Sequence, residues 1–295
     1  MKKNRLQNKR EDLLYLSPGL IVLGIIFVIP LCYAIGITFV KWTLIRPELG
    51  IKFVGLKNYI TVLTDPFTYE VLARTLLFLV FAVIIEMILG LLISTVLNWG
   101  YFGHSLIQSI CLIPFMMAPI VVGFTWKFLL NNTFGPIPKL LTNIGLGSLV
   151  ETPLLANSKT VMLMLIIVDV WQFTPFVVLV LLAGMKSLPT SPFEAAEVDG
   201  ATAWQKFRHI TLPLLKSSIL VALVMRTLTA LRVFDTISIM TGGGPGASSE
   251  IISYYGYRLA FQSYSMGLAG TVGIITMLLA LGLTITYLNK VGVDS

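Results

Sequence analysis

The sequence predicts an all-α integral membrane protein with six transmembrane helices, and its composition and hydropathy both favour that fold class. Of its 295 residues, 56% are hydrophobic and only 12% are charged, and the mean hydropathy is +0.87. An ordinary soluble domain carries about 25% charged residues. The chain therefore requires lipid around much of its surface.

Six apolar runs are long enough to cross a bilayer, which requires about 20 apolar residues per helix. We expect the first run to be retained as a membrane helix, because it is longer than a signal-peptide core and lacks an A-x-A-like cleavage site. Residues 1–295 are thus predicted to form a single transmembrane domain, with a core bundle over about residues 72–288. The runs are residues 14–39, 72–97, 106–129, 161–185, 219–240 and 266–288.

The distribution of charge predicts the topology. The net charge is +7, but the basic residues are scattered among hydrophobic runs, so we expect no nucleic-acid partner. Residues 1–12 carry a basic cluster, and the positive-inside rule places this segment in the cytoplasm. Six crossings then return the C-terminus to the cytoplasm, in the inner membrane of a bacterium or archaeon.

The sequence shows no sign of chemistry of its own. Cys32 and Cys111 lie within apolar runs, and His104 and His209 lack metal-ligand spacing, so we expect neither a disulfide nor a metal site. Neither a GxGxxG fingerprint nor a GxxxxGK[ST] loop occurs. We therefore expect that the chain is not an enzyme and holds no cofactor.

The most informative segment is the loop between the fourth and fifth runs, residues 186–217. Ser191, Pro192 and Glu194 predict a helix start with a capping box. Gly200 can end this helix, and residues 201–210 are expected to form a second short helix that Pro213 ends. The loop is thus predicted to be a helix-turn-helix along the cytoplasmic face.

This loop resembles that of binding-protein-dependent ABC importer permeases, which reads EAA, three residues, G and later I-x-LP. The resemblance implies a type I ABC importer fold, in which a coupling helix docks on an ATPase subunit. Glu194 would make a polar contact, the alanines would permit close packing and Gly200 would supply the turn. The alternative is a capped loop helix without a partner. The ATPase-coupling positions are Glu194, Ala195, Ala196, Asp199, Gly200 and Ala201, followed by Phe207, Ile210, Leu212 and Pro213.

Other motifs resemble the sugar-importer permeases, specifically the maltose-like first permease of a heterodimeric pair. They are FVGLKNY at 53–59, Trp171, Pro175 with Phe176, Phe234 with Asp235, and TGGGPG at 241–246. This resemblance implies a second homologous permease, two ATPase subunits that hold ATP and Mg²⁺, and an extracytoplasmic solute-binding protein that delivers a carbohydrate.

Ionisable residues inside the runs are expected to face the bundle interior or a wet cavity, because exposing one to lipid costs about 2.5–3.5 kcal/mol. They are Glu86, Asp169, Arg226, and Arg232 with Asp235. Asp169 and Arg226 both lie near mid-depth. Either they pair with each other and fix helix packing, or they contact a ligand.

Asp169, Phe173 and Phe176 follow an i, i+4, i+7 pattern that predicts one helix face, and so do Arg226, Ala230 and Val233. In maltose-type permeases the matching positions hold the sugar, so the resemblance implies that these six residues line the substrate path. The asparagines of the maltose type are missing, which argues against maltose itself. The alternative for the two phenylalanines is plain helix packing.

Three other functions compete with sugar import. An ion-gradient transporter would use Asp169 and Glu86 as coupling carboxylates, but no inverted repeat or pair of broken helices is visible. A channel or scaffold would leave the cytoplasmic loop without a partner. An ABC permease for a non-sugar solute such as glycerol phosphate would share the loop, and Arg226 would suit an acidic ligand.

Overall fold

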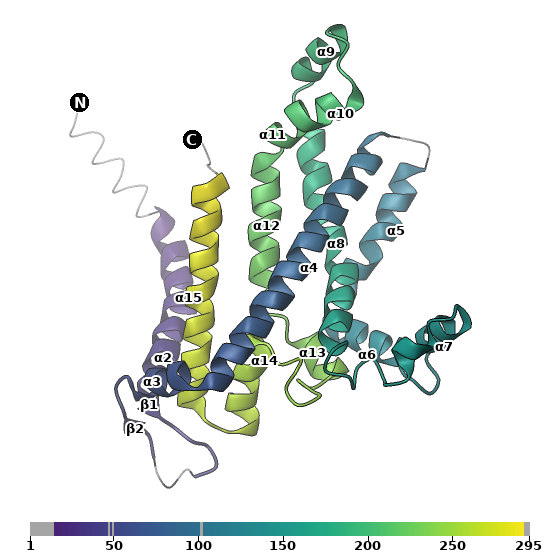
Figure 1. Cartoon of the computed structure of the whole chain (residues 1–295). Coiled ribbons are helices and arrows are strands. Elements are labelled where there is room, and N and C mark those ends of the chain that lie inside the picture. Colours follow the sequence, from purple (N-terminus) through teal and green to yellow (C-terminus); the bar gives the residue numbers. More distant parts are fainter. Residues whose placement is uncertain (1–14, 47, 49, 101–102, 292–295) are drawn as a thin grey trace, which may run out of the picture. The chain divides into compact units, whose positions relative to one another are not determined.

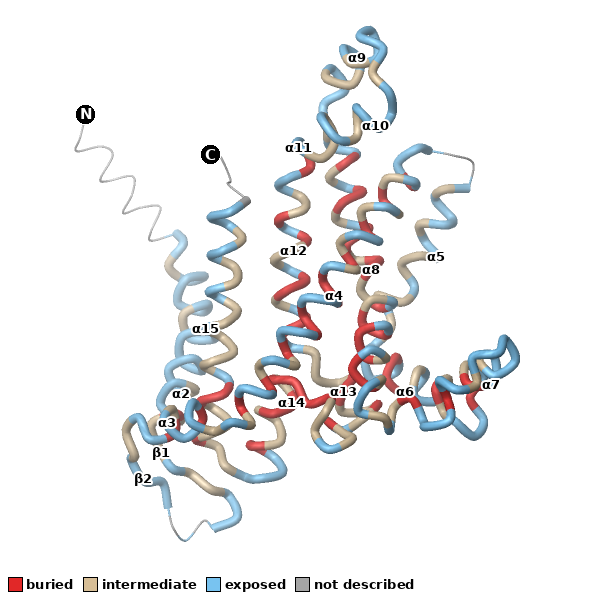
Figure 2. The backbone as a smooth tube through the Cα atoms, viewed as in Figure 1, coloured by how far each residue is buried: buried red, intermediate tan, exposed pale blue. Residues whose placement is uncertain are grey.

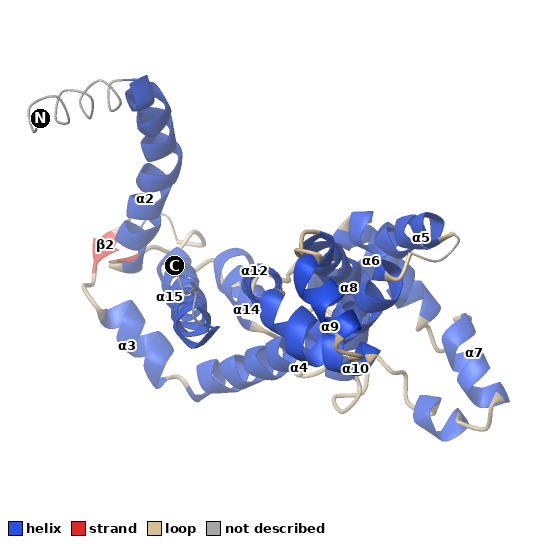
Figure 3. Cartoon of the chain, turned by 90° about the horizontal axis from the view of Figure 1, so that it is seen from above, coloured by secondary structure: helices blue, strands red, loops and turns tan. Residues whose placement is uncertain are grey.

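The computed structural model describes residues 15–46, 48, 50–100 and 103–291, and this part of the chain is almost entirely helical (Figures 1 and 3). The predicted cytoplasmic N-terminus, residues 1–12, lies outside the described residues. The chain divides into two compact units, Met1–Asp65 with Gly256–Ile275, and Pro66–Tyr255 with Thr276–Ser295. That all 295 residues act as one transmembrane domain stays a prediction.

The first unit joins a membrane-length helix to a small hairpin. The side-chain amide of Asn58 donates to the carbonyl oxygens of Thr38, at 2.8 Å, and Val40, at 2.9 Å. At Gly267 an added Cβ would lie 2.2 Å from the Val40 carbonyl oxygen, so only glycine permits this close approach. The elements are the helix Tyr15–Thr38, which contains α2 (Ile29–Thr38), antiparallel β1 (Val40–Lys41) and β2 (Lys52–Phe53), α3 (Lys57–Thr64) and the start of α15 (Met266–Val291).

The second unit holds the remaining helices. The longest are α4 (Pro66–Asn98) and α8 (Val161–Lys186), which pack along each other. The others, in chain order, are α5 (His104–Met116), α6 (Pro119–Leu129), α7 (Pro136–Asn143), α9 (Ser191–Val198), α10 (Ala203–Lys206), α11 (Leu212–Leu214), α12 (Lys216–Ala230), α13 (Asp235–Met240) and α14 (Ile252–Tyr257).

Six crossings agree with the described helices when each bent pair counts as one crossing. Four helices are long and apolar enough to span a membrane, and two bent pairs bring the total to six. The third predicted run is not straight: α5 and α6 meet at 93°. The cause is Pro119, because Ala118 before it takes an extended ψ of 135° rather than a helical one.

The fifth predicted run, residues 219–240, is wrong as a single helix. α12 ends at Ala230, and α13 starts separately at Asp235. α13 instead packs against α6, where a Cβ added to Gly123 would lie 3.1 Å from Ile239. Tertiary packing therefore outweighs the apolar pattern here.

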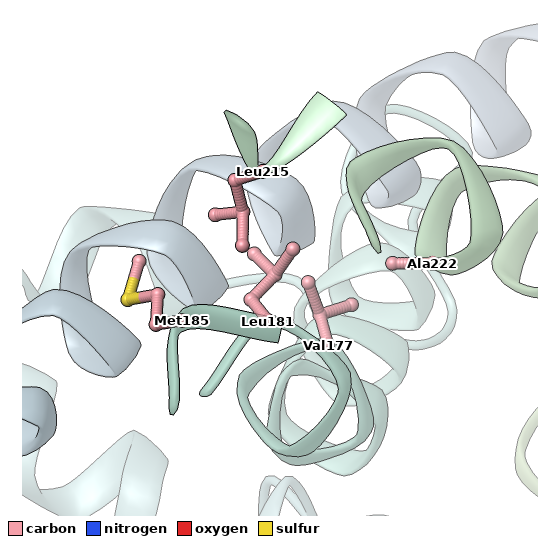
Figure 4. Close-up of a cluster of buried hydrophobic side chains, with 5 residues drawn as sticks. All are labelled: Val177, Leu181, Met185, Leu215 and Ala222. Atoms are coloured by element: carbon pink, nitrogen blue, oxygen red, sulfur yellow. The ribbon is translucent and has the colours of Figure 1, made fainter. Parts of the chain in front are cut away.

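The core of the second unit surrounds α8, the most buried of its helices (Figure 2). Val177, Leu181 and Met185 of α8 pack with Leu215, which immediately precedes α12, and with Ala222, two turns further along α12 (Figure 4). All five side chains are at most 5% exposed. This cluster fixes α12, and with it the loop that precedes α12, against α8.

Gly90 allows α4 to approach α8, and we expect Gly90→Ala to lower the free energy of unfolding by about 1–3 kcal/mol. An added Cβ would lie 2.5 Å from Cγ1 of Val177, whose χ1 is restricted in a helix. The thermal unfolding midpoint in detergent measures the effect. Gly282→Ala is the control, because no atom lies within 4 Å of its added Cβ. Equal midpoints for the two variants would contradict the close approach.

Candidate functional site

The coupling segment, residues 191–213, extends beyond the membrane-length helices at one end of the second unit (Figure 1). Its first helix, α9, has Pro192 in the first turn, as predicted. The predicted capping box at Ser191 is wrong, because Ser191 is already helical and Thr190 precedes it without a side-chain cap. An N-cap residue needs a non-helical backbone. The capping box instead starts α10, where Thr202 and Gln205 cap each other.

Gly200 ends α9, as predicted, with a φ of +71°. The amide of Ala201 donates to the carbonyl oxygen of Ala196 at 2.8 Å, and the amide of Asp199 donates to that of Ala195 at 3.0 Å. A glycine with positive φ just after a helix, together with such hydrogen bonds, is a typical helix stop. The EAA residues and the glycine are therefore parts of one compact turn.

The second helix of the segment does not end at Pro213, contrary to the prediction. α10 continues through a π-helical turn, Phe207–Thr211, into α11, which contains Pro213 in its first turn. Proline is tolerated there because the first turn of a helix leaves its N–H groups unpaired. The direction changes at Leu215 instead, where the chain bends by 63° into α12.

The surface of the coupling segment is mostly exposed. Glu194, Ala195, Asp199 and Gly200 are exposed, and Ala196 and Ala201 are half-buried. Val198 is 89% exposed. Val198 is therefore accessible to a partner subunit, although a single exposed apolar side chain does not by itself identify a binding surface.

An ion pair connects the two helices of the coupling segment. Lys206 Nζ lies 2.8 Å from Glu197 Oε1. This hydrogen bond and the positive charge of Lys206 hold the pKa of Glu197 below its ordinary value. The pair connects α9 to α10, but it is exposed, and exposed ion pairs contribute little to stability.

A second constellation lies inside the helix bundle, around Arg226 of α12. The guanidinium donates through Nε and through one terminal nitrogen to the two carboxylate oxygens of Glu86 on α4, the latter at 2.9 Å. The same terminal nitrogen donates to Asp169 on α8. Of the two alternatives for Asp169 and Arg226, the pairing is present in this structure, and Glu86 joins it as an unpredicted third member. We call these residues the buried ionic cluster.

The buried ionic cluster is almost fully shielded. The side chains of Arg226 and Glu86 are 0% exposed, and that of Asp169 is 4% exposed. Phe173 lies one turn along α8 from Asp169, with its ring centroid 4.2 Å from Cζ of Arg226, within cation–π range. Buried charges are tolerated when they are paired and hydrogen-bonded. The cluster therefore ties α4, α8 and α12 together in this state.

The other predicted path residues are less closely grouped. Phe173 and Phe176 are half-buried and contact Phe115 of α5, with ring centroids 6.2 and 5.4 Å apart. Ala230 is buried at the last position of α12. Val233 lies in the break after α12, so its predicted place on one helix face with Arg226 is wrong. The i+7 spacing assumed a helix that continues to Met240.

Two neighbours of this site, Phe115 and Gln172, were not predicted from the sequence. The Gln172 side chain donates to the carbonyl oxygen of Met117 at 3.2 Å, where α5 ends. Gln172 could have been found from the sequence, because it is a polar residue within an apolar run. Phe115 gave none, because a phenylalanine beside Pro114 looks like any other lipid-facing residue.

A family model described as "Binding-protein-dependent transport system inner membrane component" matches residues 87–291. The chain belongs to this family. The match includes the coupling segment and two of the three members of the buried ionic cluster, Asp169 and Arg226; Glu86 lies one residue before it. The recognition of an ABC importer permease from the loop is confirmed, and so is the importer-permease fold.

Curated relatives cover nearly the whole permease. The trehalose/maltose transport system permease protein MalF of Thermococcus litoralis is 37% identical over 297 residues, covering 98% of this chain and 96% of that protein. The trehalose transport system permease protein SugA of Mycobacterium tuberculosis is 31% identical over 272 residues, covering 92% and 85%.

A solved structure shares the fold of the permease. In a bacterial ABC transporter involved in the import of the acidic polysaccharide alginate, one chain matches with a TM-score of 0.81 at 24% identity, covering 99% of this chain and 100% of that one. The permease is thus an inner-membrane component of a system that depends on a solute-binding protein.

Proposed function

We propose that the permease moves a carbohydrate, delivered by the extracytoplasmic solute-binding protein, across the inner membrane. It acts in a complex with a second homologous permease and two ATPase subunits. ATP and Mg²⁺ bind in the ATPases, and this chain is not itself an enzyme. Both termini and the coupling segment lie in the cytoplasm.

The exposed coupling segment is the observation that carries this proposal. Its EAA residues lie on α9, which an ion pair connects to the capped helix α10 and which projects from the bundle with Val198 exposed. The core cluster fixes α12, which follows this segment, against α8. Force applied to α9 by an ATPase would thus reach the two helices that carry Asp169 and Arg226.

Carbohydrate as the cargo is supported by the relatives and by the aromatic faces on α8. The two named relatives transport trehalose, or trehalose and maltose. Six residues would line the path of the carbohydrate. They are Asp169, Phe173 and Phe176 of α8, Arg226 and Ala230 of α12, and Val233 after α12. In this state the ionic cluster is closed, so Phe173 and Phe176, both half-buried, offer the accessible surface for stacking on a sugar ring.

Reconstitution of the complete complex in vesicles tests the proposal. We expect the solute-binding protein to stimulate ATP hydrolysis, and ATP to drive uptake of at least one member of a carbohydrate panel. Glycerol phosphate belongs in the panel as the non-sugar comparison. Uptake by this chain alone, driven by an ion gradient, would contradict the proposal.

A further inference from the structure

A groove runs between α4 and α8 at the ends of these helices that lie away from the coupling segment. It has a volume of about 400 Å³. One wall is Leu77, Phe81 and Ile85 of α4, and the other includes Leu163 and Ile166 of α8. The α4 residues are four positions apart, so they share one helix face over about 12 Å.

The groove is apolar along most of its length, and no described residue of this chain covers it. Leu77 is 45% exposed, Phe81 is 55% exposed and Leu163 is 52% exposed, whereas Ile166 is buried at its floor. A narrow apolar groove of this length suits a single acyl chain. A helix of another subunit could also lay side chains into it, so the occupant is identified by the cross-linking experiment below.

The mouth of the groove is basic. Arg74 and Lys159 line it at the ends of α4 and α8. Glu70 holds Arg74 at 2.6 Å and offsets its charge, and Arg74 also donates to the carbonyl oxygen of Ala247. Lys159 is exposed, and within the described part of the chain its ammonium group has no ion-pair partner. The mouth thus keeps an uncompensated positive charge.

A buried hydroxyl also lines this groove. Ser248 Oγ is shielded from solvent and has no hydrogen-bond partner among the described residues. A buried donor without a partner is unfavourable. Because this oxygen has almost no accessible surface, a ligand in the groove would reach it only if the side chain rotated.

We propose that this groove binds one anionic phospholipid. Its phosphate lies at Lys159 and Arg74, and one acyl chain fills the apolar groove. Basic pockets between membrane helices recognise anionic headgroups by the same chemistry. The site is separate from the substrate path and from the coupling segment.

Native mass spectrometry of the full complex tests the site. The complex is released from vesicles of equal parts phosphatidylglycerol and phosphatidylcholine, and the ratio of the two retained lipids is measured. We expect enrichment of phosphatidylglycerol in the wild type and a fall of about fivefold in Lys159→Gln, the effect of one basic residue near an anionic lipid. Lys139→Gln on α7, also exposed, is the matched control and is expected to retain the wild-type ratio.

Two results would overturn the proposal: no preference for phosphatidylglycerol in the wild type, or the same ratio in the two lysine variants. A photo-crosslinking phenylalanine analogue in place of Phe81 identifies the occupant directly. An adduct with the mass of a phospholipid is expected. An adduct with another polypeptide would show that a subunit covers the groove and would also overturn the proposal.

Discussion

Arg226→Leu is expected to lower the free energy of unfolding by about 3–5 kcal/mol, the usual cost of removing one partner from a buried ion pair. The substitution leaves the carboxylates of Glu86 and Asp169 buried without a counter-charge, on helices that the guanidinium now joins. Denaturation of the purified chain in detergent, followed by the loss of helical signal, measures the change.

Neutralising the partners separates charge from packing. Glu86→Gln and Asp169→Asn, combined with Arg226→Leu, should recover much of the loss, because no unpaired charge then remains. If Arg226→Leu alone is as stable as the wild type, the ionic cluster does not hold α4, α8 and α12 together. If the triple variant is no more stable than Arg226→Leu, lost packing rather than charge explains the effect.

Glu194→Lys is expected to abolish stimulation of ATP hydrolysis by the solute-binding protein, with a loss of at least about tenfold. Juxtaposing like charges at an interface costs several kcal/mol. This is more than the cost of about 1.4 kcal/mol that corresponds to a tenfold loss of affinity. Because Glu194 is exposed, the chain itself should fold and insert normally. The readout is the ATPase rate of the reconstituted complex with and without binding protein.

The matched control is Glu151→Lys, an exposed residue before α8 with the same change of charge. It should keep the wild-type stimulation. Retained stimulation in Glu194→Lys would show that Glu194 makes no essential contact with the ATPase. Equal loss in both variants would point to net charge instead of a specific contact.

The membrane spans were predictable from the sequence because length and hydropathy are properties of each run by itself. The break between α5 and α6 was also readable, since Pro119 forces Ala118 out of the helical region. The break after Ala230 was not. It depends on the packing of α13 against α6, which no local pattern encodes.

The pairing of Asp169 with Arg226 was predictable from the cost of burying charge, which makes opposite charges at similar depth seek each other. The ion pair between Glu86 and Arg226 was not predictable, because it depends on which membrane spans are neighbours. In the coupling segment, the helix end at Gly200 was predicted correctly. The N-cap at Ser191 was wrong, since a serine before a proline fits both the cap and the first helical position.

Contact between the coupling segment and an ATPase subunit is the central claim, and site-directed disulfide cross-linking tests it most directly. Val198→Cys, in a background without Cys32 and Cys111, replaces a side chain that is 89% exposed on α9. We expect a disulfide with a cysteine placed on the ATPase surface, with a yield that changes when ATP binds. Labelling of the same cysteine by a membrane-impermeant thiol reagent from outside the cell, without any cross-link, would contradict it.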